Sequence, residues 1–150
     1  MALVRHSLNC LTISPRALSY SVLRETLLQS RVLAVLNHRE SPCRLWRNNV
    51  GTYCPDPVNR PQVRIAYGLG VGSADLVGLV ITNPAIFLAV EIKTPVGRLS
   101  KEQKAWGATI EKLGGIYRVI RSVEEAEKFV EWLRNNVVHN RINGAGALAS

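Results

Sequence analysis

Residues 72–93 constrain the fold most, because they contain two apolar runs joined by an Asn-Pro turn at residues 82–85. The first run, residues 76–81, is almost continuously apolar, which is typical of a strand that is covered on both faces. The second run, residues 86–94, is also a predicted strand, so its odd-numbered and even-numbered side chains point to opposite faces. The pattern predicts a two-stranded meander, with the start of the first strand beside the end of the second.

Three charged residues lie at this end of the predicted meander. Asp75 opens the first run, and Glu91 and Lys93 share one face near the end of the second. Carboxylates and backbone carbonyls are the ligands that Mg²⁺ and Mn²⁺ prefer in proteins. Asp75, Glu91 and the backbone carbonyl of Ile92 are therefore the candidate metal ligands.

These residues suit the hydrolysis of a phosphodiester. The reaction needs neutralisation of the phosphate charge and an activated water molecule, and a bound divalent ion supplies both. Lys93 would orient that water or stabilise the developing negative charge. Each residue also has an ordinary interpretation: Glu91 and Lys93 as a surface ion pair, and Asp75 as an acceptor for turn amides.

A predicted amphipathic helix at residues 21–38 contributes another candidate. Glu25 and Gln29 fall in the middle of its apolar face, where an unpaired carboxylate is costly. Glu25 could extend the metal shell or bind a second ion, whereas a salt bridge to an arginine is the alternative. The apolar residues that share this face are Val22, Leu28, Val32, Leu33, Val35 and Leu36.

A second predicted helix begins after Ser100 and ends near residue 113. Ser100 and Gln103 have the spacing of a capping box, in which each residue bonds the backbone of the other. Gln103 could also hold the attacking water or contact the scissile phosphate, so its role stays open between cap and catalysis.

The remaining patterns complete a mixed α/β sheet flanked by helices. We predict an αβββαβ core followed by a C-terminal helix, with a right-handed crossover that makes two strands parallel. One domain is expected over residues 21–136, with a flexible extension at 1–20 and a disordered tail at 137–150. The other predicted elements are strands at 43–50, 62–67 and 116–120, a loop at 51–61, and a helix at 123–136.

The glycine-rich segment at residues 68–72 does not have the spacing of a dinucleotide-binding loop, and a strand rather than a helix follows it. Its glycines are expected to turn the backbone and to leave space beside Asp75 for a bulky ligand.

The net charge of +8 is concentrated in the first 65 residues, which hold nine arginines, no lysine and three acids. Such an excess suits a polyanion, although many small basic proteins bind none. Arg47 and Arg64 could instead neutralise Glu25 or Glu40. The candidate phosphate contacts are Arg44, Arg47, Arg64 and Arg98.

No apolar run approaches the roughly 20 residues of a membrane span, so we predict a soluble protein without a membrane partner. The three cysteines form no C-x-x-C pair, which favours a reducing, cytoplasmic setting.

Several segments together resemble the VRR-NUC domain of the PD-(D/E)XK nucleases, in its small, stand-alone form from phages and bacteria. The resemblance covers roughly residues 21–130 and also includes Glu25 and Gln29. Its most specific segments are RNNVG at 47–51, GLGVGSAD at 68–75, FLAVEIKTPVGRLSKEQ at 87–103 and GGIYRVIRSVEEA at 114–126.

The resemblance implies a restriction-endonuclease-like fold and Mg²⁺- or Mn²⁺-dependent cleavage of structured DNA, such as flaps or four-way (Holliday) junctions, in replication, repair or recombination. It implies that Asp75, Glu91 and Lys93 form the catalytic motif and that Glu25 and Gln103 are accessory residues. The usual proline before the aspartate is Ala74 here. A bacterial or phage-infected cell and a homodimer are also expected; a non-catalytic nucleic-acid-binding protein on the same fold is the alternative.

Overall fold

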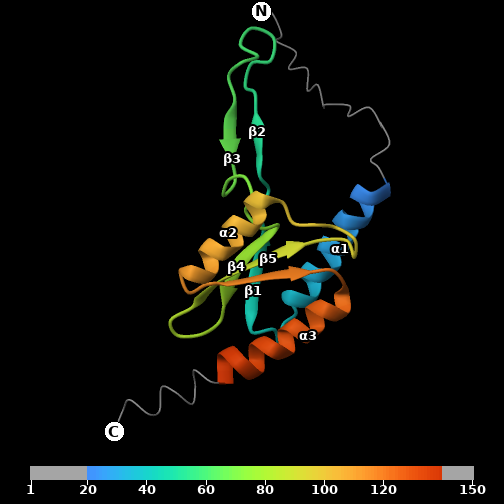
Figure 1. Ribbon diagram of the computed structural model, residues 1–150, viewed down its shortest axis with the longest axis vertical. Coiled ribbons are helices and arrows are strands. Elements are labelled where there is room, and N and C mark those ends of the chain that lie inside the picture. Colours follow the sequence, from blue (N-terminus) through green and yellow to red (C-terminus); the bar gives the residue numbers. More distant parts are fainter. Residues whose placement is uncertain (1–19, 140–150) are drawn as a thin grey trace, which may run out of the picture.

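The computed structural model describes residues 20–139, and it describes side chains from residue 24 onward. A four-stranded mixed sheet lies at its centre, with α1 and α3 packed together on one side and α2 on the other (Figure 1). This arrangement confirms the predicted restriction-endonuclease-like α/β fold. The helices are α1 (Tyr20–Leu36), α2 (Lys101–Lys112) and α3 (Val123–Leu133); the strands are β1 (Cys43–Arg47), β2 (Gly51–Tyr53), β3 (Ile65–Tyr67), β4 (Leu76–Val80), β5 (Ile86–Ile92) and β6 (Ile116–Ile120).

The strand order β1-β4-β5-β6 contains the predicted meander and the predicted parallel pair. β4 and β5 are antiparallel, with Leu76 opposite Val90, so Asp75 and Glu91 lie at the same end of the two strands. β5 and β6 are parallel, with Ile92 beside Ile120. The carboxyl ends of β5 and β6 therefore meet at the end of the sheet that carries the acids.

The two faces of β5 have different neighbours. Leu88, Val90 and Ile92 are fully buried and belong to the main core, which also contains residues of α1 and α3. The opposite face lies under α2, where Trp106 packs edge-on against Phe87 with ring centroids 6.5 Å apart. Because Glu91 alternates with the core residues, its side chain lies on the α2 side of the sheet.

The segment predicted as a loop at residues 51–61 contains a strand, so that prediction is wrong. β2 pairs with β3 in a separate two-stranded hairpin, which projects away from the main sheet (Figure 1). Gly51 lies opposite Tyr67, and a Cβ at Gly51 would come within 2.4 Å of the Tyr67 hydroxyl. A strand of three residues is too short to show a period of two, which explains why the pattern was not recognisable.

The last helix also extends further than predicted. α3 continues into a turn of π-helix, Arg134–Val138, and Val137 is buried against the core. The predicted tail from residue 137 thus begins inside a helical segment. The rest of that tail, residues 140–150, and residues 1–19 of the predicted extension lie outside the described residues. Within residues 20–139 no helix is long and apolar enough to cross a membrane.

Candidate active site

Asp75, Glu91, Lys93 and Gln103 meet at the end of β4 and β5. Asp75 accepts a hydrogen bond through Oδ2 from the backbone N–H of Ile92, at 2.8 Å. Lys93 Nζ lies 2.7 Å from Glu91 Oε1, and the side-chain amide of Gln103 donates to the same oxygen. The structure therefore brings together four residues that the sequence placed in two strands and a helix.

Glu91 is the most unusual of these groups, because its side chain is 0% exposed. Its Oε1 has two partners, whereas its buried Oε2 has no hydrogen-bond partner among the described residues. Its pKa is raised to about 7, mainly by burial; the hydrogen bond from Lys93 opposes this rise, and the negative charges of Asp75 and Glu25 contribute to it. A buried carboxylate oxygen that has no protein partner is commonly satisfied by a water molecule or an ion.

The Asp75 carboxyl is held differently. Burial raises its pKa, while the hydrogen bond from Ile92 and the charge of Lys93 act in the opposite direction. Burial thus destabilises the charged form of both carboxylates, and Asp75 adds to this effect at Glu91; a nearby cation would relieve it.

Gln103 has the predicted capping role and also contacts Glu91, whereas its predicted contact with the attacking water or the phosphate stays a prediction. Ser100 Oγ accepts from the Gln103 backbone N–H at 3.1 Å, and the Ser100 N–H donates to Gln103 Oε1 at 2.9 Å, which completes a capping box. The amide nitrogen remains available as a donor and bonds Glu91. An amide side chain can do this because it has an acceptor oxygen and two N–H donors.

Glu25 and Gln29 approach the same strand end from α1. They line a hollow of about 180 Å³ together with Thr26, Asp75 and Ile92. The negative charge of Glu25 contributes to the raised pKa values of both Glu91 and Lys93. α1 and α2 therefore approach the carboxylates from opposite faces of the sheet, and of the described helical residues Gln103 is the one that donates a hydrogen bond to them.

The donor set fits Mg²⁺ or Mn²⁺ better than Zn²⁺. Within residues 20–139 no three His, Cys, Asp or Glu side chains lie close enough together to hold a metal ion. Mg²⁺ commonly keeps several water ligands and binds through one or two carboxylates, which is what Asp75 and Glu91 offer. The partnerless Oε2 of Glu91 supports this fit.

The family comparison agrees with this geometry: the model of the VRR-NUC domain matches residues 22–124. The chain belongs to the VRR-NUC family. The match extends from the start of α1 into α3 and includes all of the residues described above. No curated protein and no solved structure matches the chain. Membership in this family gives the chain a nuclease-type function, with DNA as the substrate.

Asn48 is a residue of this VRR-NUC domain that the sequence analysis missed. Its side-chain amide donates to Ser73 Oγ at 2.8 Å and to the Ala74 carbonyl at 2.9 Å, and its Oδ1 accepts from the Leu69 N–H at 3.3 Å. Its own backbone N–H donates to the Asp75 carbonyl at 2.8 Å. One residue thus connects β1 to the segment that leads into Asp75. Asn48 lies inside the strand predicted at 43–50 and in the RNNVG segment of the resemblance, but neither signal indicated its contacts with the segment before Asp75.

The glycines before Asp75 turn the backbone as predicted. Gly68, Gly70 and Gly72 all have positive φ, between 85° and 102°. At Gly72 a Cβ would also lie 2.6 Å from the backbone of Glu102, so glycine lets this segment pack against the first turn of α2. The predicted space for a ligand beside Asp75 stays a prediction.

The four candidate DNA-binding arginines are dispersed. Arg44 lies toward the other end of β1, opposite Leu79, and its guanidinium donates to backbone carbonyls of the turn after α1, including Ser41 at 3.0 Å. Arg47 lies at the active-site end of β1 and donates to Ser30 Oγ at 2.7 Å. Arg64 and Arg98 are exposed in loops. Their contacts with phosphate stay predictions.

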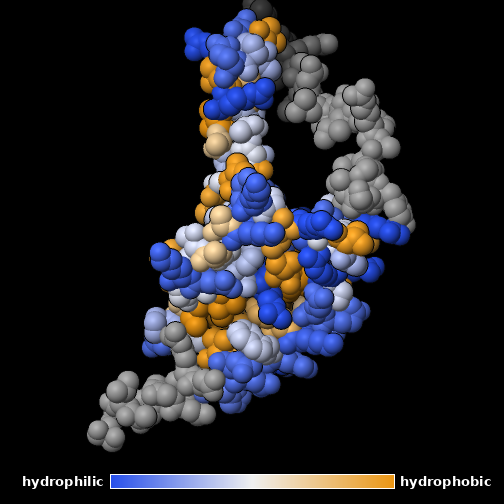
Figure 2. Space-filling model, in the orientation of Figure 1, coloured by the Kyte–Doolittle hydropathy of each residue, from blue (hydrophilic) through white to orange (hydrophobic). Residues whose placement is uncertain are grey.

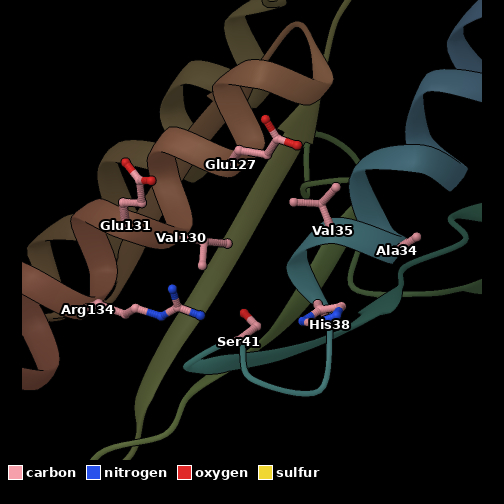
Figure 3. A pocket seen from close by; sticks show the side chains of 8 residues that line it. All are labelled: Ala34, Val35, His38, Ser41, Glu127, Val130, Glu131 and Arg134. Carbon is pink, nitrogen blue, oxygen red and sulfur yellow. The ribbon is translucent and has the colours of Figure 1, made fainter.

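The VRR-NUC domain has a second, larger hollow of about 540 Å³ between α1 and α3 (Figure 3). It contains side chains of both charges, such as Glu127 and Arg134, and shares no residue with the carboxylate site. Arg134 also donates to the Glu40 carbonyl at 2.9 Å, which ties the end of α3 to the turn after α1. We assign this hollow no catalytic role.

Proposed function

We propose that this protein is a Mg²⁺- or Mn²⁺-dependent DNA endonuclease that selects branched DNA, such as flaps or four-way junctions. The observation that carries the metal dependence is Glu91: one oxygen is fixed by Lys93 and Gln103, and the other is buried without a hydrogen-bond partner in residues 20–139. A divalent ion held there would neutralise charge on the phosphate and acidify a water molecule. Asp75 and Glu91 would hold it, with the Ile92 carbonyl as a third ligand and Glu25 as an outer or second-site ligand.

Lys93 is suited to act as a fixed cation rather than as a base. Burial lowers its pKa, but the hydrogen bond and the charge of Glu91 outweigh that effect, so the pKa of Lys93 is raised. The ammonium group therefore stays protonated at neutral pH. It would orient the attacking water or stabilise negative charge on the phosphate, as preorganised donors do in other hydrolases.

The selection of branched DNA rests on the resemblance to stand-alone VRR-NUC nucleases and on the shape of the molecule. The β2–β3 hairpin extends from the sheet near the active-site end of β1, where it could contact a second arm of a branched substrate (Figure 1). The chain as a whole carries a net charge of +8, which favours DNA binding.

The same hairpin supports a homodimer as the working unit. It carries polar and apolar side chains side by side along its length (Figure 2), including exposed Tyr53, Ile65 and Tyr67. Exposed apolar residues that gather in one region are typical of protein interfaces. Sedimentation analysis would show a two-chain species, and Tyr53→Ser with Ile65→Ser should shift it to one chain.

The decisive experiment is a cleavage panel of duplex, flap, splayed and four-way DNA, each with Mg²⁺ or Mn²⁺. Wild type should cut at least one branched substrate, and Glu91→Gln should abolish cleavage while retaining the fold and most DNA affinity. Glu111→Gln, the same substitution at an exposed position of α2, is the matched control and should cut normally.

Full cleavage by Glu91→Gln would refute this assignment. Binding without cleavage of any substrate by the wild type, with either metal, would instead favour a non-catalytic DNA-binding protein on the same fold.

A further inference from the structure

A long groove lies between the edge strand β6 and α3, on the opposite side of α3 from the hollow that faces α1. It encloses about 690 Å³ and shares no residue with the carboxylate site. β6 forms one edge of the four-stranded sheet, so the groove opens at the side of the molecule. Its lining residues are Tyr117, Arg118, Val119, Ile120, Arg121, Glu125, Lys128, Phe129 and Trp132.

The groove is basic although α3 as a whole is acidic. Arg118, Arg121 and Lys128 line it, against the single acid Glu125, whose carboxylate accepts from the backbone N–H of Arg121 at 2.7 Å. Glu127 and Glu131 lie on the other side of α3 and line the hollow toward α1. The helix thus separates its charges, and the side with excess positive charge is the one that faces β6.

An aromatic platform accompanies these charges. Trp132 stacks on Phe129 with ring centroids 5.8 Å apart and an angle of 12° between the planes. The Arg118 guanidinium lies 5.7 Å from the centroid of the Phe129 ring. Nearly half of the Trp132 surface, 46%, remains exposed. An exposed, supported ring among cations is the combination on which unstacked nucleic-acid bases bind.

The end of the groove is connected to the active site. Lys93 donates its backbone N–H to the carbonyl of Ile120 at 3.1 Å. Arg121 donates through Nη1 to the carbonyls of Thr94 and Gly97, at 2.7 and 2.8 Å. The residue at the end of β6 therefore holds the loop that directly follows Lys93. Because Arg121 also lines the groove, this end of the groove lies next to the loop that follows Lys93.

We propose that the β6–α3 groove binds a single-stranded segment of the DNA substrate, continuous with the strand at the active site. The continuity of the bound segment with a strand at the active site rests on the proposed nuclease function. Binding in the groove does not require cleavage. Lys128 and Arg118 contact phosphates, and Trp132 stacks with a base. A second copy of the chain is the less favoured occupant, because the groove has an excess of positive charge and two copies of it would repel each other.

The test measures binding of a fluorescently labelled single-stranded oligonucleotide in EDTA, so that no cleavage occurs. Lys128→Glu should weaken binding by about 10-fold or more and lower the slope of log affinity against log salt by about 1. Trp132→Ala should weaken binding about 5-fold or more, as expected for the loss of a stacking contact. Binding of blunt duplex of the same sequence should change less than binding of the single strand.

Matched controls lie on other faces of the molecule. Trp46→Ala removes an exposed tryptophan from β1, the opposite edge of the sheet, and Lys112→Glu reverses an exposed charge in the last turn of α2. Each should alter single-strand binding by less than about 2-fold. If Trp132→Ala does not fold, Lys128→Glu, at an exposed position of α3, still tests the contribution of charge to binding.

Three outcomes would overturn the inference. The first is that the wild type does not bind the single strand, and the second is that groove and control variants lose the same amount of binding affinity. The third is a change of oligomeric state in the groove variants alone, which would assign the groove to a second copy of the chain. Failure of the nuclease proposal is recognised separately, by absence of cleavage in Mg²⁺ and Mn²⁺ while groove-dependent binding in EDTA persists.

Discussion

Asp75 and Glu91 lie side by side at the ends of neighbouring strands, but the protein holds them by different means. The Asp75 carboxylate is fixed by a backbone N–H, and its own backbone is fixed by Asn48. Glu91 is fixed by the side chains of Lys93 and Gln103, and it retains one buried oxygen without a partner. Backbone contacts make the Asp75 position robust, whereas side-chain contacts make the Glu91 position easier to change by mutation.

Asp75→Asn should cause the largest loss of cleavage, and it tests how Asp75 differs from Glu91. The asparagine oxygen can still accept from Ile92, so the fold should be retained while the charge needed for a divalent ion is lost. We expect cleavage to fall by about 10²–10³-fold, the scale of losing one electrostatic group in an active site.

Asp56→Asn is the matched control for Asp75→Asn. Asp56 also accepts from a backbone N–H, that of Asn59 at 3.0 Å, but it lies in the hairpin loop. Its variant should cut at nearly the wild-type rate. Equal losses in the two variants, measured as initial cleavage rates with Mg²⁺, would contradict a metal role for Asp75.

Gln103→Ala should have the next largest effect, because it removes a donor from Glu91 and half of the capping box. We expect a 10–100-fold loss of cleavage, as for other residues that orient metal ligands. Loss of the cap should also lower the unfolding free energy by about 1 kcal/mol.

Ser100→Ala separates these two roles of Gln103. It removes the cap but leaves the Gln103 bond to Glu91, so stability should fall by a similar amount while cleavage changes little. If Ser100→Ala and Gln103→Ala lose the same activity, Gln103 acts only through the helix.

Asn48→Ala tests the backbone support of Asp75. It should reduce cleavage by about 10-fold and cost about 1–3 kcal/mol of stability, because the carbonyl of Ala74 and the hydroxyl of Ser73 lose their donor. The exposed neighbour Asn49→Ala is the control. A higher Mg²⁺ concentration should partly rescue Asn48→Ala if its defect is a displaced ligand, and rescue should be absent if the defect is purely one of stability.

The smallest expected effect is a change with pH in the unfolding free energy of the metal-free protein. The pKa of Glu91 is raised from 4.5 to about 7 in the fold, mainly by burial. The protonated group is therefore the stable form in the folded state, and its contribution to stability is complete below about pH 4.5 and lost as pH rises through 7. Unfolding free energy in EDTA should decrease over this range by on the order of 1 kcal/mol.

Glu91→Gln, which cannot titrate, should not show that decrease. Adding Mg²⁺ to the wild type at pH 7.5 should restore the lost stability, because the ion binds the ionised carboxylate. Identical pH profiles of urea unfolding for the two proteins would show that Glu91 does not titrate in this range.

Local pattern predicted much of the central sheet and its helices. The boundaries of β6 were predicted to the residue, and those of β4, β5 and α2 to within one or two residues, because each has a clear period or a capping signal. The prediction failed at β2, because three residues followed by a proline-rich segment are too few to show a period. It also ended the last helix too early, since Val137 is kept in the helix by burial against the core.

The sequence by itself established that Asp75, Glu91 and Lys93 share one end of a meander, because strand alternation and a short turn are local properties of the chain. It could not establish that Gln103 reaches Glu91, that Asn48 holds the segment before Asp75, or that one oxygen of Glu91 has no partner. Those facts depend on how α2 packs on the sheet and on how β1 pairs with β4. These contacts join residues that are far apart in the chain, and a local periodic pattern does not reveal them.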